Sequence, residues 1–227
     1  SFRRTWKTPR VHISVDTAGR SACATLFLFV TALQAVIIDR VAVTLGNQVI
    51  TESELIREIQ LTAFLNGEEP DLRPDAKRKA AERLIEQKLV RKEMQLGRDP
   101  EPPSSAADEM LAQFEKQRAW NPGEFDAKLK HAGLTREELK NHLHWQAALL
   151  QFVDFRFRPA VQVTDQDIRK YYREHFENAP GKKPALEDVR EQIVQIVTAR
   201  RADEQMDAWL KDTRKHTRIE FHPEAFS

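Results

Sequence analysis

The sequence predicts a mainly α-helical protein with a small antiparallel β-sheet, whose two ends fold together. Residues 38–50 combine a short alternating strand, a tight turn and a second strand, and a helix follows directly. Residues 186–221 combine a long amphipathic helix with a terminal alternating strand. A two-stranded hairpin is only marginally stable alone, so each end needs the other to bury its apolar face. We therefore expect the last strand to join the first two in one sheet, with the intervening helices displayed between the ends.

The composition favours long, solvated helices. Charged residues make up 31% of the 227 residues and glycine occurs only 7 times, whereas a hydrophobic content of 41% is sufficient for a core. The formal net charge is +1, and residues 1–35 hold five basic residues against one acidic residue. That segment therefore carries +4, which leaves −3 on the remainder of the chain. A mildly acidic body gives no electrostatic reason to bind nucleic acid.

The first 35 residues have the pattern of a secretory signal peptide, in which a basic region precedes an apolar run. Cleavage after Ala32 or after Ala35 would release an exported mature protein. If the apolar run continues through Ile38, it would instead form an uncleaved membrane anchor. A third interpretation is that the run is an apolar helix or strand buried in the folded domain.

The only cysteine, Cys23, lies within the predicted signal peptide. Removal of this segment would leave a mature protein without cysteine. Disulfide bonds, thiolate catalysis and cysteine-bound metal would then all be excluded.

Turn and capping signals divide the first part of the mature chain into elements. Residues 40–45 alternate as a half-buried strand, Gly46 and Asn47 supply a two-residue turn, and residues 48–50 return as the partner strand. Capping boxes at 51–54 and 135–138 each open a helix. The helices are expected at about 51–65, 74–96, 104–120, 124–131 and 135–155.

The remaining elements follow the same logic. A cap at Thr164 opens a sixth helix to about residue 176, and a polar loop rich in helix breakers follows at 177–184. The last helix is expected at 186–213 and the closing strand at 217–221. The predicted organisation is therefore a signal peptide (1–35), a helical domain (36–176), a short loop (177–184) and a C-terminal helix and strand that complete the domain (185–227).

Several of these segments resemble SurA-type periplasmic chaperones. Residues 38–55, I-D-R-V-A-V-x-x-G-N-Q-V-I-T-x-S-E-L, resemble the opening of that family, and R-L-I-E-Q-K-L-V at 83–90 resembles its second helix. Residues 126–139, with A-G-L-T-R-E-E, and T-D-Q-D-I-R-K-Y-Y at 164–172 continue the similarity in the same order. The closing helix and strand are also similar, so the resemblance covers nearly the whole mature chain. It implies the SurA N-terminal-like chaperone fold, closed by the C-terminal helix and strand.

The resemblance implies an ATP-independent periplasmic chaperone that binds unfolded or partly folded envelope and outer-membrane proteins. Many relatives carry parvulin-type prolyl isomerase domains between the Tyr-Tyr helix and the final helix. Only residues 177–184 occupy that interval here, whereas such a domain needs on the order of 100 residues. We therefore expect a chaperone module that is not an enzyme. The alternatives are a protein related to peptidyl-prolyl isomerases and an envelope scaffold anchored in the membrane by an uncleaved signal segment.

Binding of an unfolded chain requires exposed apolar and aromatic surface, and it can also use a free sheet edge. Aromatic residues on the later helices are the candidates for this surface. Each of them is also suited to an ordinary core contact between helices, so we expect a subset of them to line a cleft. The candidates are Phe114, Trp120, Phe125, Trp145, Phe152, Phe155 and Phe157.

Motifs for catalysis or for cofactor binding are not found in the sequence. A glycine-rich phosphate loop, a nucleophile elbow and zinc-ligand spacing are all missing. His142 and His144 would point about 200° apart on a helix, so they are not expected to share a metal. The carboxylates, among them Glu58 and Glu86, show no spacing that singles out an acid–base pair. The basic run at 77–79 is interpreted as a solvated helix face.

Overall fold

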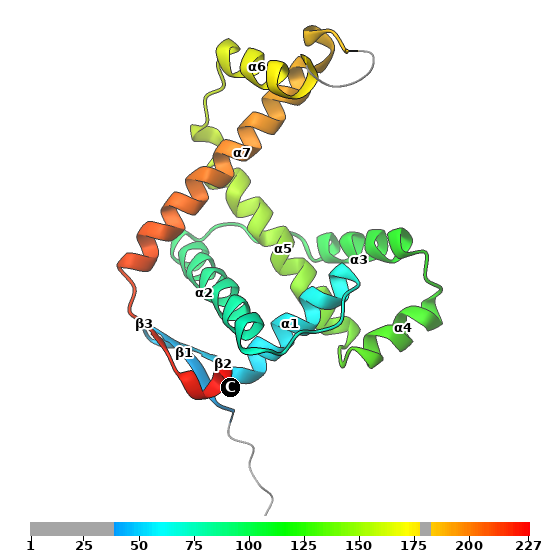
Figure 1. Cartoon of the computed structure of the whole chain (residues 1–227), viewed down its shortest axis with the longest axis vertical. Coiled ribbons are helices and arrows are strands. Elements are labelled where there is room, and N and C mark those ends of the chain that lie inside the picture. Colours follow the sequence, from blue (N-terminus) through cyan, green and yellow to red (C-terminus); the bar gives the residue numbers. More distant parts are fainter. Residues whose placement is uncertain (1–38, 178–182) are drawn as a thin grey trace, which may run out of the picture. The chain divides into compact units, whose positions relative to one another are not determined.

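The structure, a computed structural model, describes residues 39–177 and 183–227 (Figure 1). The predicted signal peptide with its cleavage positions lies outside the described residues, as does most of the predicted loop at 177–184. Over the described ranges, the protein is mainly helical and contains a three-stranded antiparallel sheet. The predicted fold class is therefore confirmed.

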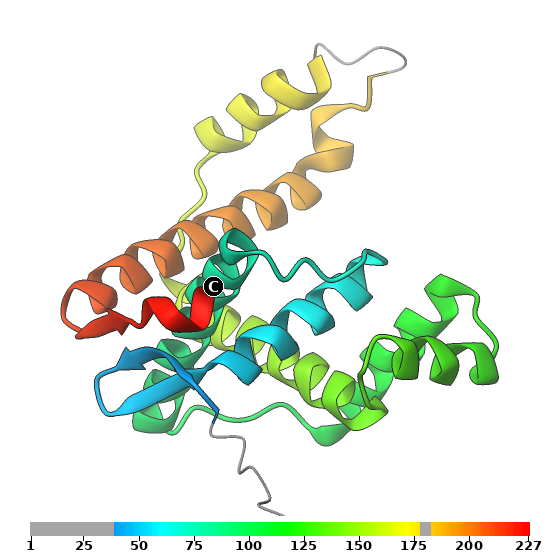
Figure 2. The same ribbon diagram turned by 60° about the horizontal axis from the view of Figure 1, so that its bottom comes forward.

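The first and last strands pair as predicted. The order in the sheet is β2 (Gln48–Thr51), β1 (Val41–Leu45) and β3 (Ile219–Phe221), with β1 antiparallel to both neighbours. Figures 1 and 2 show β1 and β3 side by side, although they lie near opposite ends of the described chain. Gly46 forms the β1–β2 turn with φ of 59°, a left-handed conformation that costs glycine little.

Five helices follow β2, and their bounds lie within about two residues of the predicted ones. Both predicted capping boxes are present, at Thr51 with Glu54 and at Thr135 with Glu138. The second helix ends at Gly97, and Arg98 after it adopts a left-handed conformation with φ of 53°. The helices are α1 (Glu52–Asn66), α2 (Pro74–Gly97), α3 (Ser104–Arg118), α4 (Pro122–His131) and α5 (Arg136–Arg156).

The chain then forms two further helices that pack against each other. These are α6 (Asp165–Tyr172), which continues as a π-helical turn over Arg173–Glu177, and α7 (Leu186–Lys215). Short 3₁₀ turns follow α5 at η1 (Arg158–Ala160) and β3 at η3 (Pro223–Phe226). Among the described residues, no helix is long and apolar enough to cross a membrane.

Three apolar clusters hold these elements together. The largest joins the sheet, α2 and the C-terminal halves of α5 and α7, around residues such as Ile85 and Phe152. The second joins the end of α1, α3, α4 and the first half of α5 around Phe125. The third joins α6 to the first half of α7 around Ile193. Because α5 and α7 each contribute to two clusters, these long helices connect the clusters to one another.

Lys77 on α2 corrects the interpretation of the basic run as solvated. Lys77 is 6% exposed, and its Nζ donates hydrogen bonds to Glu52 Oε1 at 2.9 Å, to the main-chain oxygen of Ala225 at 3.3 Å and to that of Ser227 at 2.9 Å. A buried ammonium group needs such partners, because its desolvation is costly. The turn η3 covers this part of α2, and the local sequence around Lys77 contains no sign of that distant cover.

An ion pair between α6 and α7 gives a pH-dependent prediction. Arg201 donates to Asp167 Oδ1 at 2.6 Å, and Thr164 also hydrogen bonds to this carboxylate. Mainly because of Arg201, the pKa of Asp167 falls from 3.8 to about 2. Since the folded-state pKa is the lower one, ionised Asp167 stabilises the fold above pH 3.8, and this contribution is lost as the pH falls through about 2.

NMR titration of the Asp167 carboxyl group tests this assignment. We expect a pKa of about 2 in the wild type and a value closer to 3.8 in Arg201→Gln. The control is Arg200→Gln, because Arg200 pairs with Glu204 and makes no bond to Asp167. An unchanged pKa in Arg201→Gln would show that Arg201 does not cause the shift.

Candidate functional site

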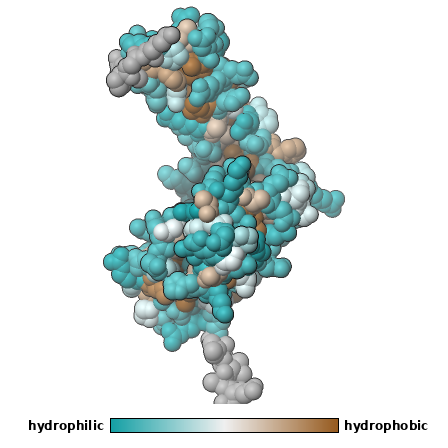
Figure 3. Space-filling model, turned by 90° about the vertical axis from the view of Figure 1, so that its right-hand side faces the viewer, coloured by the Kyte–Doolittle hydropathy of each residue, from teal (hydrophilic) through white to brown (hydrophobic). Residues whose placement is uncertain are grey.

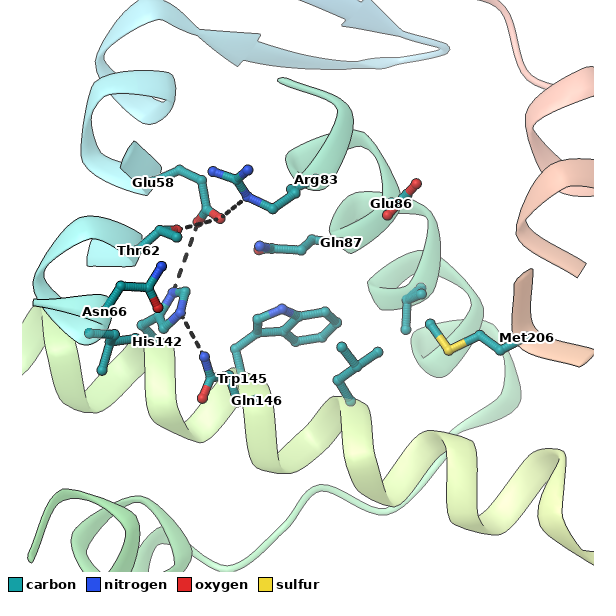
Figure 4. Close-up of a pocket in the computed structure, with 13 residues that line it drawn as sticks. Glu58, Thr62, Asn66, Arg83, Glu86, Gln87, His142, Trp145, Gln146 and Met206 are labelled. Atoms are coloured by element: carbon teal, nitrogen blue, oxygen red, sulfur yellow. Dashed lines mark hydrogen bonds and ion pairs between the residues drawn. The ribbon is translucent and has the colours of Figure 1, made fainter. Parts of the chain in front are cut away.

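A cavity of about 370 Å³ lies between α1, α2 and α5, and α7 closes one side of it (Figure 4). Its volume falls within the range of small-ligand sites and is sufficient for side chains of a bound polypeptide. One end of the cavity is polar and the other is apolar. The residues that line it are Glu58, Thr62, Leu65 and Asn66 of α1, Arg83, Glu86, Gln87 and Val90 of α2, His142, Trp145, Gln146 and Leu149 of α5, and Met206 of α7.

The polar end is built around Glu58, which is 5% exposed. Arg83 Nε donates to Glu58 Oε1 at 3.0 Å, and Thr62 Oγ1 donates to the same oxygen at 3.4 Å. The second carboxylate oxygen, Oε2, lies 3.9 Å from His142 Nδ1 and accepts no hydrogen bond from any described residue. The cavity therefore has a buried carboxylate with one oxygen that is free to bind a donor.

His142 is held as a neutral imidazole next to this carboxylate. Burial lowers the pKa of His142 below its usual 6.5, with Glu58 opposing this change and the positive charge of Arg83 adding to it. His142 Nε2 lies 3.0 Å from the amide nitrogen of Gln146. An amide nitrogen can only donate, so Nε2 accepts and Nδ1 carries the proton on the side of Glu58.

The apolar end is formed by Val90, Leu149, Met206 and the indole of Trp145. The guanidinium of Arg91 lies 3.9 Å from the centre of the Trp145 ring. Arg91 lines a neighbouring cavity of about 320 Å³, which Trp145 also lines, so the indole forms a wall between the two cavities. Figure 4 shows the indole nitrogen on the side of the ring that faces Gln87, and this N–H donates to no described residue.

Three of the seven aromatic candidates are buried and do not line the cavity between α1, α2 and α5. Phe125, Phe152 and Phe157 are buried, with exposed fractions of 1%, 2% and 8%. Phe152 packs against Phe157 and Trp209 at ring distances of 5.7 Å and 5.8 Å, and Phe125 lies in the aromatic cluster of α1, α3 and α4. The expectation that they form exposed surface is therefore wrong, because each one fills the core between helices.

The other four candidates lie in three different places. Phe114 and Trp120 are half-buried and pack against each other at a ring distance of 6.2 Å in the second cluster. Trp120 also lines a cavity of about 410 Å³ at the end of α1. Phe155 is 65% exposed on α5, and it does not line the cavity between α1, α2 and α5. Trp145 is also buried, at 4% exposed, so the expectation of exposed surface is wrong for it too, but of the seven candidates only Trp145 lines that cavity.

The polar residues of the cavity were not predicted, although the sequence contains a sign of them. Glu58, Thr62 and Asn66 lie four residues apart on α1, and so do His142 and Gln146 on α5. Residues at this spacing share one helix face. Polar residues repeated at this interval beside an apolar stripe indicate a face that is buried but not purely apolar.

Comparison with known proteins does not assign the chain to a family. No protein-family model matches the sequence, and no curated protein is significantly similar to it. Within the described ranges, no group of three or more His, Cys, Asp or Glu residues is placed to hold a metal ion. The fold and the site therefore define a helical protein with a mixed polar and apolar binding cavity.

Proposed function

We propose that the protein is an exported, ATP-independent chaperone of the SurA type. It would bind unfolded or partly folded envelope proteins, including outer-membrane proteins, in the periplasm. The observation that carries this proposal is the cavity between α1, α2 and α5, which offers Val90, Trp145 and Leu149 to an apolar side chain. The pairing of β1 with β3 adds support, because the resemblance to this family implies such a closure.

The proposed mechanism is reversible shielding of client segments. Burial of one apolar side chain contributes about 1.5–3 kcal/mol, and the loss of translational and rotational freedom on association offsets much of it. Each segment would therefore bind weakly and be released without nucleotide hydrolysis. Figure 3 shows hydrophilic residues over most of the face in view, with hydrophobic residues scattered among them. Such a surface keeps a chaperone soluble while a client is bound.

The proposal is tested by dilution of a urea-denatured outer-membrane β-barrel protein into buffer with the full chain. We expect light scattering from the aggregating client to fall as the chaperone is added, and ATP to make no difference. An equal mass of an unrelated folded protein is the control. Unchanged aggregation at several-fold molar excess would contradict the proposal.

Two further measurements separate the rival functions. A proline-peptide isomerisation assay is expected to give the uncatalysed rate, and acceleration by the protein would favour a prolyl isomerase. N-terminal sequencing of the exported protein is expected to find a start after Ala32 or Ala35. An intact N-terminal segment in the membrane fraction would favour the anchored scaffold.

A further inference from the structure

We infer that the cavity between α1, α2 and α5 selects client segments in which a basic side chain, lysine or arginine, lies next to an apolar residue. This inference rests on the proposed function and adds the chemical class of the segment that is bound. Three features of the cavity lead to it: a carboxylate oxygen that no described residue hydrogen bonds, a second carboxylate at the rim, and an apolar wall at the other end.

The first feature is Glu58 Oε2. The side chain of Glu58 is 6% exposed, and Arg83 and Thr62 both bond to Oε1. No described residue donates a hydrogen bond to Oε2, and His142 Nδ1 lies 3.9 Å from it. Because Oε2 borders the cavity and accepts no hydrogen bond from the described residues, a cationic donor on a ligand would form a charge-assisted hydrogen bond with it.

The second feature is Glu86, one turn from Arg83 on α2. Glu86 also lines a second cavity, which lies against α7, so it stands where the two cavities meet. Its nearest cation is Arg214, at 4.0 Å, and Arg214 bonds more closely to Glu82 at 2.5 Å. Burial raises the pKa of Glu86, and neighbouring Glu82 adds to this effect. Glu86 therefore has no close ion pair of its own, and its half-exposed carboxylate can accept a cation from a ligand.

The third feature is the apolar surface that lies in the same cavity as the two carboxylates. Lysine and arginine combine an apolar stem with a charged head, so they need both kinds of surface. Val90 and the indole of Trp145 offer the apolar surface, and Arg91 already covers one face of the indole from the neighbouring cavity. The titratable residues that line the cavity are two carboxylates, one arginine and a neutral histidine. This set carries a net charge of −1, which favours a basic ligand and disfavours an acidic one.

The test compares two extended fluorescent peptides that differ only in the side chain at the central position. Both contain leucine residues around a central position, which is arginine in one peptide and citrulline in the other. Citrulline has nearly the same shape as arginine but no charge. By fluorescence anisotropy with the full chain, we expect the arginine peptide to bind about tenfold more tightly at low ionic strength. The preference should shrink as salt is added.

Variants then assign the preference to the two carboxylates. Glu58→Gln keeps the shape of the side chain, so it should weaken binding of the arginine peptide much more than binding of the citrulline peptide, and thereby remove most of the preference for arginine. Glu86→Gln, at the half-exposed rim, should reduce the preference without any risk to the fold. The matched control is Glu93→Gln on the same helix, because Glu93 pairs with Arg156 and does not line the cavity.

The outcomes distinguish this inference from the proposed function. Equal binding of both peptides by the wild type would overturn the basic preference and leave the chaperone proposal standing. A preference that survives in both Glu58→Gln and Glu86→Gln would also overturn it. If neither peptide binds and client aggregation is not suppressed, the proposed function itself fails.

Discussion

Phe152→Ala is expected to lower the free energy of unfolding by about 3–5 kcal/mol. The ring of Phe152 is 2% exposed and packs against Phe157 and Trp209 where α5 meets α7. Its removal leaves a cavity among side chains that are fixed by two long helices, so the site cannot collapse easily. Urea denaturation followed by far-UV circular dichroism measures the change.

Phe155→Ala is the matched control for Phe152→Ala. It makes the same substitution three residues along α5, at a side chain that is 65% exposed. We expect it to change the free energy of unfolding by no more than about 0.5 kcal/mol. Equal losses of stability in the two variants would contradict the assignment of Phe152 to the core and of Phe155 to the surface.

Gln87→Trp is expected to abolish the suppression of client aggregation while the protein stays folded. Gln87 is half-buried, lines the cavity and makes no hydrogen bond to a described residue. Its replacement therefore breaks no hydrogen bond, and the larger indole would occupy the space that a client side chain needs. Light scattering of the denatured client, together with the thermal midpoint of the variant, measures both parts of the prediction.

The control for this variant is Gln113→Trp on α3. Gln113 is exposed and does not line the cavity, so the same chemical change there should leave client protection intact. Full protection by a folded Gln87→Trp variant would show that clients bind elsewhere. The cavity would then lose its place as the client-binding site.

The fold could be predicted because it depends on short local motifs and on the need of each end of the chain to bury its apolar face. The capping boxes at Thr51 and Thr135 place two helix starts from four residues each, and both are present in the structure. The pairing of the two ends followed from the fact that neither end could bury its own apolar face. The 3₁₀ turn Pro223–Phe226 was not predicted, because it is stabilised by its distant contact with Lys77.

The site was harder to predict than the fold, for a physical reason. Helical spacing shows which residues share a face, but it does not show which other helix covers that face. Phe152 and Phe155 are both aromatic residues near the end of α5, yet α7 packs against only the first of them. The partners of Glu58 come from α2 and α5 as well as from its own helix. No single stretch of sequence therefore shows that these residues meet.

The central position of β1 in the sheet has a consequence for biogenesis. Thr44 hydrogen bonds to His222 at 2.9 Å, across 178 positions of the chain. Pairing over such a separation is slow to form, and it must wait until both partners have left the ribosome. The helices can form earlier from nearby residues, whereas the sheet is completed after synthesis of this region. The pairing of β1 with β3 therefore stays unformed during most of the synthesis of the chain.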